Sequence, residues 1–295
     1  MSFFKYLTSS QMDHKWGINI KAGGFEQIKP GAKYPNPDHP STYFFNFDTG
    51  RVLNEYQFLY ITRGQGILTT ESAGRMMVKE GSMFILYPNE WHTYKPDVDK
   101  GWDEYWFGTS GPVIENIMAE QDFFSIKSPL LEIGYREYIF QLYNQMIETI
   151  KNEPPGFQQI VSGIAMHILG RVYAVNKLIK FEGKEIETKI RKATILFREN
   201  ATSNISPETV ADQLNLGYSW FRKMFKNYTG LSPAKYFQQV KIQRAKEYLL
   251  TTDKSIKEIS YLLGFDNLFY FSRQFKKLTG SSPSEFKKSN RIDKK

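Results

Sequence analysis

The sequence predicts an α+β protein with an N-terminal β-barrel and helical hairpin, followed by an all-α part that carries two helix-turn-helix motifs. Three observations support this fold class. Short aromatic and β-branched runs, separated by glycine turns, fill residues 18–108. Helical periodicity begins near residue 112. Near the C-terminus one stretch occurs twice, first at residues 220–237 and again at residues 270–287. Two copies are too few for a solenoid, so they indicate a duplicated small module.

The β-rich part is best seen in "YQFLYITRGQGILTTESAGRMMVKEGSMFILYPNEWHTYKP". Turns are expected at Gly64 and Gly66, at Ala73-Gly74 and at Glu80-Gly81. Short strands at this spacing are typical of a barrel or a sandwich, so residues 1–111 are expected to form one domain.

Two long helices are expected next, within residues 112–180. In "YREYIFQLYNQMIETI" the side chains of Tyr138, Leu142, Met146 and Thr149 recur at helical spacing and predict one face. Pro154-Pro155-Gly156 ends that helix, and "GFQQIVSGIAMHILGRVYAVNKLI" supplies the second. Residues 181–188 are charged, contain a glycine and show no apolar face, so they are predicted to be a linker.

The repeated stretch has the composition of a helix-turn-helix in each copy. Ser206 can cap a first helix that Pro207 opens, and Ser255 with Glu258 forms a capping box in the second copy. Gly217 and Gly264 are the expected turn residues, and Gly217 is expected to take a positive φ. "YSWFRKMFKNYTG" and "LFYFSRQFKKLTG" are then the second, recognition helices.

Each predicted recognition helix has two distinct faces. The apolar stripes, expected to be core, are Phe221, Phe225 and Tyr228 in the first copy and Phe271, Phe275 and Leu278 in the second. The opposite faces, predicted to contact DNA, carry Tyr218, Ser219, Arg222, Lys223 and Lys226, and Leu268, Phe269, Ser272, Arg273 and Lys276. Residues 187–295 hold 21 Lys+Arg and 10 Asp+Glu, whereas the rest of the chain is slightly acidic. This asymmetry favours a polyanionic partner over an ordinary solvated face.

The C-terminal part of the sequence resembles a known protein family. "ISYLLGFDNLFYFSRQFKKLTGSSPSEFKK" is similar to the DNA-binding domain of the AraC/XylS family of bacterial transcription regulators. The shared positions are Ile259-Ser260, Gly264-Phe265, Phe271-Ser272-Arg273, Phe275-Lys276, Thr279-Gly280 and Ser282-Pro283. Ser260 departs from the family's usual alanine. The resemblance implies that residues 189–290 bind double-stranded DNA through both motifs and that the chain regulates transcription.

The N-terminal part more loosely resembles the cupin-type sensor of the same family, including its arabinose-responsive members. The similar stretches are "ITRGQG", "EGSMFILYPNEWHTY" and "GWDEYWFGTSG". The resemblance implies a small-molecule effector, a mono- or oligosaccharide, and a homodimer formed through the helical hairpin. By this resemblance the effector-binding residues are His39, Arg51, His92, Tyr94, Glu104 and Trp106. Trp102 and Trp106 also alternate with period two, so plain packing is an alternative for that strand.

Many cupins are metalloenzymes, but the residues here argue against catalysis. The chain has four histidines and no cysteine, and it lacks the paired histidines that a metal site of this kind needs. We therefore expect no enzyme activity and no cofactor, and His92 is interpreted as a hydrogen-bonded histidine at the barrel mouth. Two alternatives stay open: a metal-dependent sugar isomerase or dioxygenase fused to a DNA-binding module, and a constitutive DNA-binding protein whose barrel is only structural.

The sequence gives no sign of a membrane or an export route. No apolar run approaches the ~20 residues of a membrane span, and the first residues lack the apolar stretch of a signal peptide. The absence of cysteine fits a reducing compartment. A cytoplasmic location is the expectation.

Overall fold

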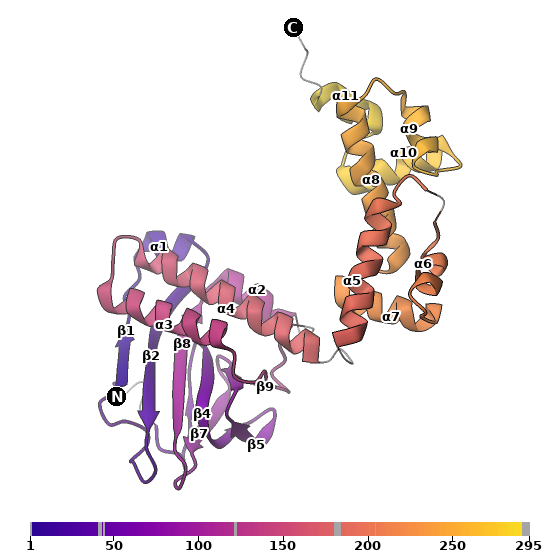
Figure 1. Ribbon diagram of the computed structural model, residues 1–295. Coiled ribbons are helices and arrows are strands. Elements are labelled where there is room, and N and C mark those ends of the chain that lie inside the picture. The colour runs from indigo at the N-terminus through magenta and orange to yellow at the C-terminus, as the bar shows by residue number, and fades with distance from the viewer. Residues whose placement is uncertain are drawn as a thin grey trace. The chain divides into compact units, whose positions relative to one another are not determined.

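The computed structural model describes residues 2–40, 43, 45–120, 123–179, 184–203 and 205–290. The chain divides into two compact units, Met1–Lys180 and Phe181–Lys295, and each is described by itself (Figure 1). The N-terminal unit is rich in β-structure with helices and the C-terminal unit is all helical, which confirms the predicted fold class.

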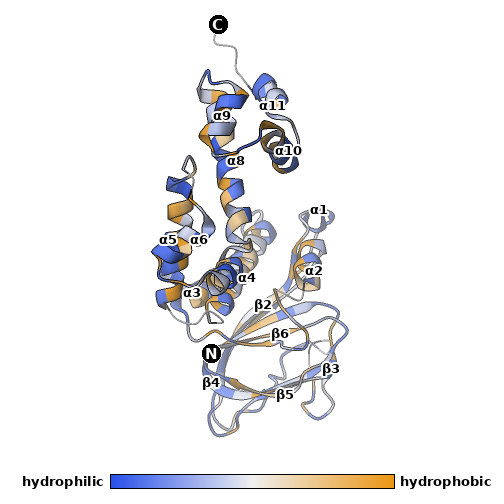
Figure 2. Cartoon of the chain, turned by 90° about the vertical axis from the view of Figure 1, so that its right-hand side faces the viewer, coloured by the Kyte–Doolittle hydropathy of each residue, from blue (hydrophilic) through white to orange (hydrophobic). Residues whose placement is uncertain are grey.

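The N-terminal unit is built on an antiparallel sheet that curls into a barrel (Figure 2). Its described strands are β1 (Ser2–Tyr6), β2 (Asn19–Ile28), β3 (Arg51–Val52), β4 (Tyr56–Thr70), β5 (Gly74–Lys79), β6 (Ser82–Leu86), β7 (Trp91–Pro96), β8 (Trp102–Ser110) and β9 (Leu130–Glu132). The first half of β4 pairs with β6 and β8, and its second half pairs with β5 and β7. A single long strand therefore belongs to both walls of the barrel.

Two glycines permit the close approach of strands where β4 changes partners. Gly64 has a φ of 86°, and a Cβ there would collide with the backbone of Gly101 and Trp102. A Cβ on Gly66 would meet the carbonyl of Lys95 and the Trp102 ring. Larger residues at these two positions would push the walls apart.

The two faces of β8 contribute to two different cores. Trp102 and Trp106 point into the barrel interior with Leu59, Leu68 and Phe84. Tyr105 and Phe107 point outward and pack with the helices that cover this face. Because both faces are covered, the strand is buried at almost every position, and its polar residues Asp103, Glu104 and Thr109 are buried as well.

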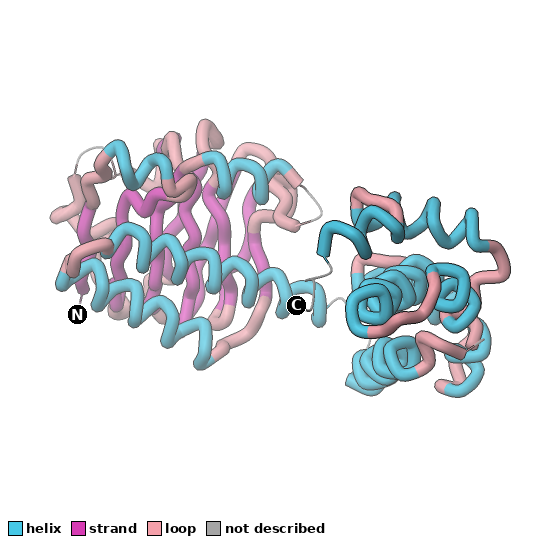
Figure 3. The backbone as a smooth tube through the Cα atoms, turned by 90° about the horizontal axis from the view of Figure 1, so that it is seen from above, coloured by secondary structure: helices cyan, strands magenta, loops and turns pink. Residues whose placement is uncertain are grey.

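The covering helices are α1 (Gln11–Lys15), α2 (Pro112–Ala119), α3 (Glu137–Asn152) and α4 (Phe157–Ile179). In Figure 3 α3 and α4 run side by side across the sheet. The face predicted for α3 is right at Met146, which is buried, and wrong at Tyr138, which is 44% exposed. Ile139, Tyr143 and Ile150 are buried in its place. The predicted and the observed residues both have helical spacing, and packing against the sheet buries the stripe that contains Ile139, Tyr143 and Ile150. The hairpin thus shares one core with the outer face of the sheet.

The C-terminal unit contains α5 (Lys184–Glu199), α6 (Pro207–Gln213), α7 (Tyr218–Thr229), α8 (Pro233–Thr251), α9 (Ile256–Leu262), α10 (Leu268–Thr279) and α11 (Pro283–Asn290). Residues 181–183 of the predicted linker lie outside the described residues. The remainder, residues 184–188, is not linker but the start of α5. The prediction overlooked Ile186, which packs with Ile190, Ala193 and Phe197 on the core of the first module.

Both predicted helix-turn-helix motifs are present, with most of the predicted caps. Ser206 accepts a hydrogen bond from the Thr209 amide, and Ser255 and Glu258 form the reciprocal capping box. The prediction for Gly217 is wrong: its φ is −63°, and the left-handed residue of the first turn is Asn215, with a φ of 53°. Asparagine is one of the few non-glycine residues that tolerate this conformation.

The apolar stripes of the recognition helices form the cores of the two modules over their first two positions. Phe221, Phe225, Phe271 and Phe275 are fully buried. The third positions, Tyr228 and Leu278, are 38% and 41% exposed, so their assignment to the core is wrong. Each lies at the last turn of its helix, just before the glycine that ends it.

Candidate functional site

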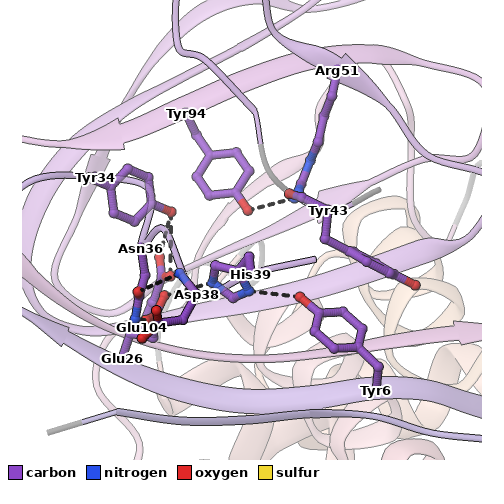
Figure 4. A network of polar contacts seen from close by, with 10 residues as sticks. All are labelled: Tyr6, Glu26, Tyr34, Asn36, Asp38, His39, Tyr43, Arg51, Tyr94 and Glu104. Atoms are coloured by element: carbon purple, nitrogen blue, oxygen red, sulfur yellow. Dashed lines mark hydrogen bonds and ion pairs between the residues drawn. The ribbon is translucent and has the colours of Figure 1, made fainter. Parts of the chain in front are cut away.

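A small cavity lies inside the barrel of the N-terminal unit. Its lining comes from β1, from residues 34–45 and from strands β3, β4, β7 and β8: Tyr6, Tyr34, Pro35, His39, Tyr43, Phe45, Arg51, Gln57, Tyr94, Glu104 and Trp106. The cavity volume is about 20 Å³. This is roughly the space that one water molecule needs. The chain's own side chains fill the rest (Figure 4).

Two buried carboxyl groups mark one end of this cavity. Glu26 and Glu104 face each other across the β2–β8 ladder and are 1% and 3% exposed. Tyr34 donates its hydroxyl to Glu104 at 3.1 Å, and Asn36 and His39 contact Glu26 at 2.7 and 3.1 Å. Burial, with the nearby charge of Glu26, raises the pKa of Glu104 to about 8. Glu104 is therefore largely protonated at neutral pH.

Arg51 marks the other end of the cavity. Its guanidinium donates to the hydroxyl of Tyr94 at 2.9 Å, to the carbonyl of Tyr43 and to Nε2 of His92 at 3.2 Å. Its charge also lies over the ring of Phe45, 4.6 Å from the centroid. The hydrogen-bond partners of this cation are thus neutral groups.

His92 acts behind Arg51 rather than inside the cavity. Because its Nε2 accepts from Arg51, its Nδ1 must carry the proton, and Nδ1 lies 3.0 Å from the carbonyl of Glu90. Burial, with the positive charge of Arg51 acting in the same direction, lowers the pKa of His92 to about 4. A neutral, fully buried imidazole therefore holds the arginine in position.

Tyr34, Pro35, His39 and Tyr43, from the segment between β2 and β3, line one side of the cavity. Tyr34 and His39 extend from this segment toward the two carboxyl groups (Figure 4). Tyr6 of β1 donates to or accepts from Nδ1 of His39 at 2.7 Å, which connects the first strand to the same network. The cavity has space for about one water molecule, so a larger ligand requires its lining to rearrange.

Five of the six predicted effector residues, namely His39, Arg51, Tyr94, Glu104 and Trp106, line this cavity, and His92 lies behind Arg51. The prediction missed Tyr6, Glu26, Tyr34, Tyr43 and Gln57. Glu26 left no clear signal, because β2 also carries the polar residues Asn19, Lys21 and Gln27.

The described residues contain no cluster of three or more His, Cys, Asp or Glu side chains that could hold a metal ion. Two of the histidines have local partners: His14 bonds to Asn19 and His167 to Arg171. In the same described part of the chain, no helix is long and apolar enough to cross a bilayer.

A second candidate site is the solvent-facing side of α7 and α10. Of the ten residues predicted to contact DNA, seven are exposed: Ser219, Arg222, Lys223, Lys226, Phe269, Arg273 and Lys276. Tyr218 and Leu268 pack partly against their module cores, and Ser272 is half-buried. The exposed sides of α7 and α10 are therefore strongly basic, and they contain seven of the ten predicted residues.

Comparison with known proteins finds a family model in each of the two units. The AraC-like ligand binding domain matches residues 45–167, and a helix-turn-helix domain matches residues 210–289. The chain belongs to the AraC family. It is an AraC-type DNA-binding transcription regulator with a ligand-binding domain, and not an enzyme. The predicted family and fold are confirmed, and the enzyme alternative is set aside.

Relatives within the AraC family align along most of the chain. The raffinose operon transcriptional regulatory protein RafR of Pediococcus pentosaceus is 23% identical over 83% of this chain and 89% of its own length. The arabinose operon regulatory protein of Escherichia coli is 27% identical over 76% of this chain and 77% of its own length. Among solved structures, the C-terminal domain of AraT from Geobacillus stearothermophilus is 30% identical, covers 36% of this chain and 88% of that chain, and has a TM-score of 0.35.

Proposed function

We propose that this AraC-family regulator responds to a mono- or oligosaccharide bound in the barrel cavity and contacts DNA through α7 and α10. The observation that carries the proposal is the composition of the cavity: aromatic rings, the buried carboxyl group of Glu104 and one arginine with only neutral hydrogen-bond partners. The relatives act on the raffinose and arabinose operons, which supports a sugar. As a DNA-binding regulator the protein would work in the cytoplasm.

The cavity chemistry suits a polyol better than an apolar ligand. Sugars present C–H faces that stack on aromatic rings, and Trp106 with Tyr6 and Tyr43 offers such rings. Sugar hydroxyls can donate to Glu104 and accept from Arg51. In the closed state Tyr34 takes the position of such a donor, because its hydroxyl bonds to the same carboxyl group.

Effector binding would act by shifting a population. A sugar can occupy the cavity only if residues 34–43 release their contacts with Glu26 and Glu104, so it binds one arrangement of this segment much better than the other. The affected network includes Tyr6 of β1. If the arrangement of this segment also changes the dimer or the affinity for DNA, effector binding would regulate transcription.

The test is a thermal-shift screen of the full-length protein against mono- and oligosaccharides. A ligand at 100 times its dissociation constant stabilises the native state by about 2.7 kcal/mol, which is several degrees for a unit of this size. Trp106→Ala should abolish the shift, whereas Trp16→Ala, at a position 58% exposed just after α1, should leave it unchanged. If no sugar shifts the melting temperature while DNA binding is intact, the barrel is structural or its effector is of another class.

We further propose that the protein forms a homodimer through α4. The outward face of this helix carries Ile160, Gly163, Met166, Gly170, Ala174 and Leu178, of which Ile160 and Leu178 are 44% and 43% exposed. A Cβ added at Gly163 or Gly170 would meet nothing in the protomer. Such a face allows two helices to approach closely.

A further inference from the structure

The first turn of α10 presents an unusually exposed aromatic side chain. Phe269 is 84% exposed, the largest value among the exposed large hydrophobic residues of the described chain. Within that part of the chain its ring has no aromatic or cationic neighbour. An apolar ring in this position on a DNA-facing helix needs a partner outside the protein to be removed from water.

The residues around Phe269 hold it in place without covering it. Leu268 turns inward and packs on the module core. Asn267 caps the helix, because its side chain accepts hydrogen bonds from the amides of Phe269 and Tyr270 at 2.7 and 3.1 Å. The backbone that carries the ring is therefore fixed before any partner binds.

Tyr270, the residue after Phe269, is held by contacts with other side chains of the second module and of α8. Its hydroxyl lies 3.5 Å from Nε2 of Gln238 on α8, and its ring lies 6.3 Å from that of Phe265. Arg273 lies over the Tyr270 ring, 5.7 Å from the centroid. Phe269 and Arg273 are four residues apart, so an apolar ring and a guanidinium occupy adjacent turns of one helix face.

The first module has different chemistry at the equivalent place. In the repeat, Ser219 of α7 corresponds to Phe269, and Lys223 corresponds to Arg273. The exposed face of α7 consists of Ser219, Arg222, Lys223 and Lys226, without an exposed large apolar side chain at its start. The two modules thus share their fold but differ in the residue at the N-terminal turn, which enters the major groove most deeply in such motifs.

We propose that Phe269 reads the 5-methyl group of a thymine, so that the second module selects thymine by apolar contact while the first module reads its bases through polar groups. The thymine methyl is the apolar group that a base pair presents in the major groove. Arg273, Lys276 and Lys277 are exposed further along the same helix and make this part of the surface basic, which favours a DNA groove over an apolar protein partner. The inference rests on the proposed contact between α10 and DNA.

The test uses a duplex selected from a random pool by the full-length protein, with and without a mixture of sugars. Each thymine of the selected site is then replaced by deoxyuridine, which removes only the methyl group. For the unaltered protein, one such replacement should weaken binding about fourfold, as expected for one buried methyl group. Phe269→Ala should bind the thymine duplex about tenfold more weakly and should no longer distinguish thymine from deoxyuridine at that position.

Two controls separate reading from folding. Phe269→Leu keeps an apolar side chain and should retain the preference for thymine. Met12→Ala, at a position 69% exposed on α1 of the N-terminal unit, should leave both the affinity and the deoxyuridine effect unchanged. Equal binding to thymine and deoxyuridine at every position, or an equal loss for Phe269→Ala on both duplexes, would overturn the inference. If no duplex is selected under either condition, the DNA contact of α10 itself is wrong.

Discussion

The raised pKa of Glu104 makes a quantitative prediction about stability. A buried carboxyl group with a pKa near 8 must take up a proton when the chain folds at neutral pH, because in the unfolded chain its pKa is 4.5. Between these two values the unfolded state binds fewer protons than the folded one, so the free energy of unfolding falls as pH rises. The slope is about 1.4 kcal/mol per pH unit. At pH 7 the loss relative to acid conditions is about 3 kcal/mol.

Glu104→Gln removes this proton uptake while keeping a group that can accept from Tyr34. The free energy of unfolding of the variant minus that of the unaltered protein should therefore increase by about 2.7 kcal/mol between pH 5.5 and pH 7.5. Taking the difference cancels the other titrating groups. The stabilisation should be visible as a higher urea midpoint at pH 7.5 and should nearly disappear at pH 5.

Urea unfolding followed by tryptophan fluorescence is a suitable assay. Four of the five tryptophans lie in the N-terminal unit, so a Trp220→Phe background restricts the signal to that unit. Val98→Thr, at a position 68% exposed and without a titratable side chain, is the control and should give a difference that does not change with pH. A flat difference for Glu104→Gln across this range would refute the idea that Glu104 is protonated in the folded state.

Three other changes test the remaining proposals. Because the pKa of His92 is lowered to about 4, the unaltered protein should lose about 1.4 kcal/mol of stability per pH unit from this residue as pH falls from 6.5 toward 4. His92→Gln keeps an acceptor for Arg51 but cannot be protonated, so this loss should be absent in the variant, as measured by urea unfolding in the same background. Gly170→Leu should raise the helix stability of the protomer slightly yet produce monomers in sedimentation velocity, and an unchanged dimer would place the interface elsewhere. Lys226→Gln and Lys276→Gln should each weaken DNA binding on all sequences and reduce the salt slope by about one unit, as measured by titration at several salt concentrations.

The features predicted correctly from the sequence depend mainly on local interactions. The caps at Ser206 and Ser255, the end of α10 at Gly280 and the buried phenylalanines each depend on residues within a few positions. The duplication of the module also helped, because a cap or a turn predicted in one copy could be checked at the equivalent position of the other. Local patterns failed where the sequence allows two alternatives. In the first turn either Asn215 or Gly217 could take the left-handed conformation, and Asn215 does. On α3 two stripes have helical spacing, and packing against the sheet decides which one is buried.

The cavity was predicted only in part because its residues meet through long-range register. Glu26 faces Glu104 because β2 and β8 pair with one particular alignment. Tyr34, Asn36 and His39 come from an irregular segment between β2 and β3, which has no periodicity that could indicate an inward side chain. His39 was included through the family resemblance, and its contact with Glu26 could not be predicted from any pattern near it.

The closed cavity and the neutral Glu104 have a common consequence for regulation. Holding this carboxyl group protonated at pH 7 lowers stability by about 3 kcal/mol, and the single hydroxyl of Tyr34 compensates only in part. A sugar that brings several hydroxyl donors would favour the ionised carboxylate and return some of this free energy on binding. The available difference is comparable to the 1–3 kcal/mol that typically couples two sites in allosteric proteins. A barrel that keeps its acid neutral and its arginine without an ionic partner is therefore suited to a switch, because a polyol bound as proposed would offer hydroxyl groups to both.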